Sequence, residues 1–140
     1  MGRMFYRCSS LKYIDLSSFN TKSVEGFYEM FYDCDSLESL DLSHFKFDCV
    51  DYIDGMFSGC TNLKYLNVRG WDISKAGRSS GEGINLVFSG CTSLTSLDLT
   101  GWNPISAKRT SALFRDCESL TEIIMPDFTT PLVEEFNLMF

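Results

Sequence analysis

Cysteine and aspartate are the side chains of this sequence whose types and spacing could do chemistry, and both recur at regular intervals. Five phenylalanines lie 26, 26, 31 and 26 residues apart, and each is followed three residues later by a cysteine. These cysteines are Cys8, Cys34, Cys60, Cys91 and Cys117. A zinc site needs thiols and imidazoles that are paired locally, so one cysteine per repeat does not predict a metal centre. A fixed repeat position is instead typical of a small, buried side chain.

The oxidation state of this cysteine column has two alternative outcomes. Stacked repeats would place equivalent Cα atoms about 5 Å apart, which lies within the range that a disulfide can bridge. In-register side chains point in parallel, however, and this favours free, buried thiols. Cys49 lies outside the column, near the start of a predicted helix, so it is the thiol expected at the surface.

An acidic column accompanies the cysteines, with Asp15, Asp41, Asn67 and Asp98 at equivalent positions. These residues alternate with leucines, so we expect them opposite the buried face of a strand, on the concave side of a sheet. Calcium binding is one interpretation, because calcium takes oxygen ligands from several carboxylates. The other is hydrogen bonding to the following Ser or Thr and to exposed backbone. The second is favoured by Asn67, by Ile124 in the fifth repeat and by the lack of a D-x-D-x-D-G loop.

Aromatic and basic side chains share the face that is predicted for the acidic column. Tyr13 and Tyr65 flank the strand positions, and Arg69 projects into the same region. Tyr and Arg anchor many protein interfaces, although Tyr is also frequent in strands through β-propensity alone. We predict a partner-binding face with neither a metal nor a cofactor. Its candidate contacts are Tyr13, Asp15, Asp41, Tyr65, Asn67, Arg69 and Asp98.

The sequence gives little support for catalysis or for nucleic-acid binding. His44 is the single histidine, and a catalytic base must be oriented by neighbouring groups. The glycine-rich segment 77–83 lacks the G-K-[ST] ending of a phosphate loop. The 12 Lys and Arg against 19 Asp and Glu leave a net charge of −7, which disfavours a phosphate-binding surface. No apolar stretch approaches the ~20 residues of a membrane span. We therefore predict a protein that is not an enzyme.

The elements that must position these columns follow from the rest of the repeat. Leucines at an L-x-x-L-x-L spacing end in a period-two alternation, which predicts a short strand in each repeat. Apolar residues at i, i+3 and i+7 within 24–31, 50–57 and 133–140 then predict a short helix that returns the chain. Thr130 and Pro131 suit the start of the third. Trp71 and Trp102 recur in register and are expected in the core.

Together these elements predict an α/β fold, a right-handed leucine-rich-repeat solenoid of about five coils of 26 residues. A short parallel β-sheet would form its concave face, and short helices would lie on its convex side. Residues 1–140 form a single domain in this prediction, with an insertion near 75–83 in the 31-residue repeat. No terminal cap is recognisable, so we expect a fragment of a longer repeat array, with ends on which further repeats could associate.

The repeat resembles that of the BspA-like leucine-rich-repeat surface proteins, in the variant MFxxCxSLxxLDLSxF. Residues 30–45, MFYDCDSLESLDLSHF, match this pattern nearly position for position, and the resemblance extends over essentially the whole chain. It implies a bacterial cell-surface or secreted protein that acts in adhesion, with no catalytic residues. The partner would be a protein or a glycan, such as host extracellular matrix or another cell surface, bound at the concave face. The alternative is a structural spacer with no ligand of its own.

Overall fold

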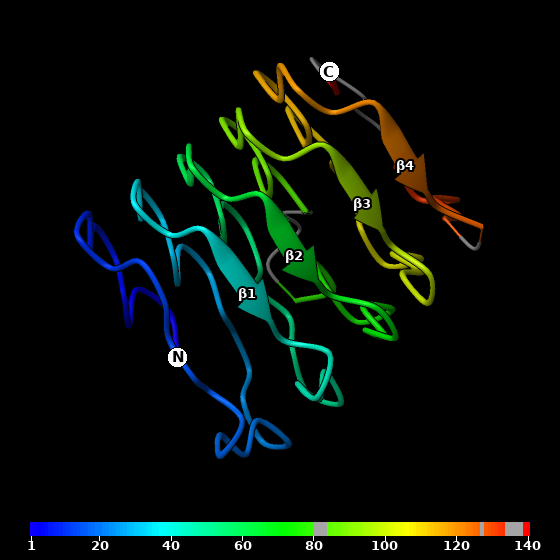
Figure 1. Ribbon diagram of the computed structural model, residues 1–140. Coiled ribbons are helices and arrows are strands. Elements are labelled where there is room, and N and C mark those ends of the chain that lie inside the picture. Colours follow the sequence, from blue (N-terminus) through cyan, green and yellow to red (C-terminus); the bar gives the residue numbers. More distant parts are fainter. Residues whose placement is uncertain (80–83, 127, 134–138) are drawn as a thin grey trace.

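The structure is a computed structural model that describes residues 1–79, 84–126, 128–133 and 139–140. Successive repeats of the chain lie side by side, each following the course of the one before (Figure 1). Four of them contribute a strand of three residues: β1 (Ser39–Asp41), β2 (Tyr65–Asn67), β3 (Ser96–Asp98) and β4 (Glu122–Ile124).

The strands pair in parallel and in the register of the sequence repeat. β1 pairs with β2 so that Leu40 lies opposite Leu66, and β3 pairs with β4 so that Leu97 lies opposite Ile123. These are two separate two-stranded sheets. Because equivalent residues are neighbours in space, every column of the sequence becomes a row of side chains that runs along the stack.

The apolar columns form one continuous core. Phe31, Phe57 and Phe88 are fully buried, and their rings stack with centroids 5.8 Å apart at each step. Trp71 and Trp102 are also fully buried, which confirms their predicted place in the core. Their rings stack 5.7 Å apart, and each indole N–H donates to a backbone carbonyl of the preceding repeat, at 2.9 and 3.2 Å. The indole N–H groups are therefore satisfied although they are buried.

The predicted fold class is wrong. Among the residues that the structure describes there is no helix, so the chain is not an α/β leucine-rich-repeat solenoid with helices on a convex side. In segments 24–31 and 50–57, for which the spacing predicts helices, Gly26 and Tyr52 form an isolated parallel bridge, and tight turns follow at 28–31 and 54–57. The third predicted helix, 133–140, and the insertion near 75–83 lie partly outside the described residues.

The reason lies in where the backbone N–H groups of these segments are directed. Phe27 N donates to the Tyr52 carbonyl at 2.7 Å, and Phe31 N donates to the Met56 carbonyl at 2.9 Å, both in the next repeat. Met30 N, between them, donates to the Phe27 carbonyl three residues back, at 3.1 Å. An α-helix requires every amide to bond four residues back within the segment. Here alternate amides bind the neighbouring repeat instead.

Backbone angles show the same departure from a helix. Glu29 and Asp33 have φ of 50° and 53°, and the equivalent Gly55 and Gly59 have φ of 60° and 77°. Two left-handed residues, four apart, therefore flank the Met–Phe pair in these repeats. A right-handed helix cannot pass through such positions. The i, i+3, i+7 spacing is real, but it arises because repeated turns return the same residues to the core.

Two glycines at equivalent positions give a test of this stacking. Gly70 has φ of 76° and open space where a Cβ would lie, whereas Gly101 has φ of 95° and a Cβ there would lie 2.9 Å from the Gly70 Cα. Gly70→Ala should lower the free energy of unfolding by about 1 kcal/mol, the penalty of a left-handed alanine. Gly101→Ala should lower it further, because the neighbouring backbone must move. Urea denaturation measures both, and equal losses would contradict the close approach of these repeats.

Candidate functional site

The exposed side of the strands forms the candidate site, and we call it the strand face. Leu40 and Leu66, at the centres of β1 and β2, are 3% and 6% exposed and point into the core. Because side chains alternate along a strand, the residues on either side of these leucines must point outward. The strand face consists of Ser39, Asp41, Tyr65, Asn67, Arg69, Ser96 and Asp98, together with Tyr13 and Asp15 of the first repeat, which forms no strand but lines the same hollow.

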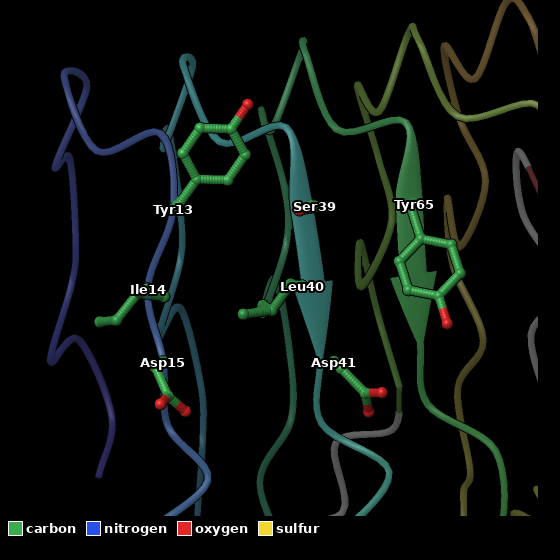
Figure 2. A pocket seen from close by; sticks show the side chains of 7 residues that line it. All are labelled: Tyr13, Ile14, Asp15, Ser39, Leu40, Asp41 and Tyr65. Atoms are coloured by element: carbon green, nitrogen blue, oxygen red, sulfur yellow. The ribbon is translucent and has the colours of Figure 1, made fainter.

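A hollow of about 390 Å³ lies on the N-terminal half of this face. Tyr13 and Tyr65 stand on either side of it, with 63% and 56% of their surfaces exposed. Figure 2 shows Ser39 between the two rings, with the carboxylates of Asp15 and Asp41 further along the same chain segments. The hollow exists because the middle repeat has a serine where the repeats on both sides have a tyrosine.

The aspartates of the column act first on their own backbone. Oδ1 of Asp15 accepts the Ser17 amide at 2.9 Å, and Oδ1 of Asp41 accepts the Ser43 amide at 2.9 Å and the Ser43 hydroxyl at 2.7 Å. Oδ1 of Asp98 accepts the amide two residues on in the same way, at 2.9 Å. This is the turn-capping interaction typical of Asp and Asn. It supports the hydrogen-bonding interpretation of the column.

These hydrogen bonds also set the charge of the carboxylates. The pKa of Asp41 lies below its ordinary value of 3.8, chiefly because the Ser43 backbone amide and then its hydroxyl donate to the ionised form. The pKa values of Asp15 and Asp98 are lowered in the same direction by Ser17 and Thr100. Hydrogen bonds to the charged form favour it. The strand face therefore carries full negative charges at neutral pH.

The Oδ2 atoms of Asp41 and Asp98 link neighbouring repeats, because each lies next to an amide or a basic side chain of another repeat. Asn67 Nδ2 donates to Oδ2 of Asp41 at 3.1 Å, so the one amide in the column bridges two repeats. Arg69 Nε lies 3.0 Å from Oδ2 of Asp98. Exposed pairs of this kind contribute about 0–1 kcal/mol each. Their main effect is to fix the positions of the side chains on the face.

Glu38 holds Tyr13 in place across the first two repeats. The negative charge of Glu38, and then hydrogen bonding between the two side chains, raises the pKa of Tyr13. Lys64 Nζ lies 3.9 Å from the same carboxylate. A tyrosine oriented in this way loses less side-chain freedom on binding a partner.

The predicted contact residues thus fall into two adjoining groups. Tyr13, Asp15, Asp41 and Tyr65 line the first hollow, and Tyr65 also belongs to a second one of about 240 Å³. The described residues around the second hollow are Lys64, Tyr65, Leu66, Asn67, Arg69, Ser96 and Asp98. Sequence reasoning did not single out Ser39 or Glu38 as functional. The alternation of Tyr and Ser in one column is the signal that could have found the hollow.

The middle of the cysteine column lies in the core, whereas its two ends, Cys8 and Cys117, are exposed and half-buried respectively. All six cysteines are free; Cys34, Cys60 and Cys91 are buried, whereas Cys8 and Cys49 are exposed. Cys60 Sγ donates to the Phe31 carbonyl at 3.1 Å, and the other buried thiols repeat this bond to the preceding repeat. Burial raises the pKa of Cys34 to about 11 and raises that of Cys60 as well. These thiols are structural rather than nucleophilic.

The single histidine also has a structural environment. His44 is half-buried rather than fully exposed, its Nε2 lies 3.0 Å from the Leu16 carbonyl, and its ring packs edge-on against Phe45. In the described ranges no three His, Cys, Asp or Glu side chains gather as a metal site would require. The same part of the chain contains no helix long and apolar enough to cross a bilayer.

Together the stacked core and the outward strand face define a repeat protein. The chain belongs to the DUF285 family, described as a Mycoplasma protein of unknown function, which it matches over residues 1–82 and again over residues 78–140. Comparison with curated proteins and with solved structures gives no significant match.

The thiol environments predict a divided reactivity. In native protein at mildly alkaline pH, Cys8 and Cys49 should react rapidly with a chromogenic disulfide reagent, because they are exposed. Cys34, Cys60 and Cys91 should react only after unfolding, since burial disfavours their thiolates. Cys117 is half-buried, and its raised pKa of about 11 should make it react more slowly than the exposed pair. Counting released thiolate before and after adding denaturant checks this. Rapid reaction of Cys60 or Cys91, identified by mass spectrometry, would contradict the packing.

The lowered aspartate pKa values predict acid sensitivity. Folded-state values below the ordinary 3.8 mean that these groups stabilise the protein above that pH and lose their contribution as the pH falls through the folded values. A variant with Asp15, Asp41 and Asp72 changed to Asn keeps the capping oxygens but cannot titrate there. Its free energy of unfolding should fall less between pH 5 and 3 than that of the wild type. Parallel pH profiles would refute the assigned role of the caps.

Proposed function

We propose that this chain is a non-enzymatic binding module of a bacterial cell-surface or secreted protein, and that it contacts a protein or glycan partner through the strand face. The observation that carries the proposal is the pair of exposed tyrosines, Tyr13 and Tyr65, around the hollow at Ser39. Large aromatic side chains are usually buried, so two of them on one outward face need an explanation. Partner binding provides one, because tyrosine supplies contact area with few rotatable bonds.

The scaffold beneath the face supports this role. The leucines and phenylalanines under the strands are almost completely buried, so the outward side chains stand on a tightly packed base. Glu38 and Asn67 further restrain the side chains above it. Adhesion through such a surface, with extracellular matrix or another cell surface as partner, is the activity that the resemblance to BspA-like proteins implies.

A structural spacer without a ligand is the second candidate. It is favoured by the Asp column, because in three repeats the Oδ1 atom accepts the backbone amide two residues on. This gives the aspartates a structural role that requires no partner. In that case the tyrosines reflect β-propensity alone. The two functions differ in whether changes to exposed side chains affect the activity of the protein.

A binding experiment separates the two functions. The chain would be tested against purified extracellular-matrix proteins and immobilised glycans, beside a variant with Tyr13→Ser and Tyr65→Ser. Loss of two aromatic contacts should weaken binding by about tenfold or more. A matched control changes Tyr28 and Tyr52 to Ser, because these tyrosines are 44% and 37% exposed but line a different hollow.

The outcome assigns the function directly. Binding that the first variant loses and the control keeps supports the strand face. Equal binding by all three proteins places the contact elsewhere and contradicts the proposal. Absence of binding across the whole panel, by folded protein, favours the spacer.

A further inference from the structure

The charge around the first hollow distinguishes among partners. Its lining includes two carboxylates, Asp15 and Asp41, and two tyrosines, and none of the seven residues that form it is a lysine or an arginine. The chain as a whole carries a net charge of −7. Electrostatic complementarity at interfaces therefore favours a cationic group in this hollow and disfavours an anionic one.

The nearby basic side chains of the strand face are already paired elsewhere. Arg69 lies against Asp98 at 3.0 Å, and Lys64 approaches Glu38 at 3.9 Å. Within the described residues, no ion pair includes Asp15 or Asp41. His44 acts on both carboxylates by charge and contributes least among the causes that lower their pKa values, and it forms no ion pair with either in the described residues. The carboxylates of the hollow are therefore not ion-paired with any lysine or arginine that the structure describes.

The tyrosines add a second, independent preference for cations. These residues are more than half exposed, and the face of an exposed tyrosine ring attracts a lysine or arginine side chain. The two rings belong to repeats two strand spacings apart, about 10 Å. Side chains on one side of an extended peptide are about 7 Å apart, so successive basic residues could reach both ring faces and the carboxylates between the repeats.

We infer that the strand face binds a lysine- or arginine-bearing segment of a protein partner, seated over Ser39 between Tyr13 and Tyr65, with its cations at Asp15 and Asp41. This inference rests on the proposed function and names the chemistry of the partner. A sulfated or carboxylated glycan would meet repulsion at the same place. A neutral glycan would leave both carboxylates without a counter-charge.

The test uses a fluorescent peptide in which lysine alternates with serine, and the same peptide with every lysine acetylated. Acetylation removes the charge and leaves the aliphatic part of the side chain unchanged. The charged peptide should bind, its affinity should fall as salt is raised, and the acetylated peptide should bind at least tenfold more weakly. Equal binding of the two peptides, or tighter binding of neutral or sulfated oligosaccharides in a parallel titration, would overturn the inference.

Isosteric variants locate the contact. Asp15→Asn with Asp41→Asn removes two charges but keeps the capping acceptors, as Asn67 already does for the Arg69 amide at 3.4 Å. Affinity for the charged peptide should fall about five- to tenfold, because two exposed charge contacts are lost. Asp72→Asn is the matched control, because Asp72 caps Ser74 in the same way but does not line the hollow. An equal loss of affinity with Asp72→Asn would show that the peptide responds only to the overall negative charge of the protein, and would contradict binding at the hollow.

The two proposals fail in different ways. If matrix proteins or glycans bind through Tyr13 and Tyr65 while neither peptide binds, the strand face functions as proposed and the basic-segment inference is wrong. If the charged peptide binds equally well to the Tyr13→Ser, Tyr65→Ser variant and to the wild type, the strand face is not the site of the basic segment and the inference is contradicted. The proposed function is contradicted only if matrix proteins or glycans also bind this variant as well as the wild type.

Discussion

The hydrogen bond between equivalent turns of adjacent repeats is the interaction on which the rest of this structure depends. Phe5 N, Phe31 N and Phe57 N each donate to a carbonyl of the next repeat at 2.9 Å. This bond fixes the distance and register between repeats, so the phenylalanine rings stack and the cysteine thiols reach the carbonyls of the repeat before them. Because no repeat can bury its apolar side chains alone, the register and the core are formed together.

The longer repeat shows how strictly this register is kept. Phe57 N still bonds across the insertion, to the Val87 carbonyl at 2.9 Å. Asp54 accepts both the backbone and side-chain amides of Asn85, at 3.1 and 3.0 Å, and thereby holds the chain where it rejoins the stack. The register of the stack is therefore kept across the longer repeat, as repeat architectures generally allow. The columns on either side of the insertion remain continuous.

The strand face is the part of each repeat that the stacking leaves variable. The inward positions are restricted to residues that fill the core, and the aspartates are held by the turns that they cap. Tyr13, Ser39 and Tyr65 have neither restriction, and the difference in size between tyrosine and serine forms the hollow on this surface. Membership of the DUF285 family adds no activity, since the family is described as one of unknown function. These exposed side chains are therefore the basis for proposing a binding function, and the negative charge beside them restricts the kind of partner.

The sequence by itself determined the period, the buried columns and the positions of four short strands, because each depends on apolar spacing that every repeat shares. The strand that the same spacing predicts in the first repeat, at 14–16, is not formed. The sequence also placed Trp71 and Trp102 in the core and the aspartates on the exposed side. It could not decide between helix and turn, since i, i+3 and i+7 return to the core in both. That choice depends on whether an amide such as Phe31 N bonds within its own segment or with the next repeat. Only the tertiary structure fixed that partner, and with it the hollow, because Tyr13, Ser39 and Tyr65 become neighbours only when three repeats lie side by side.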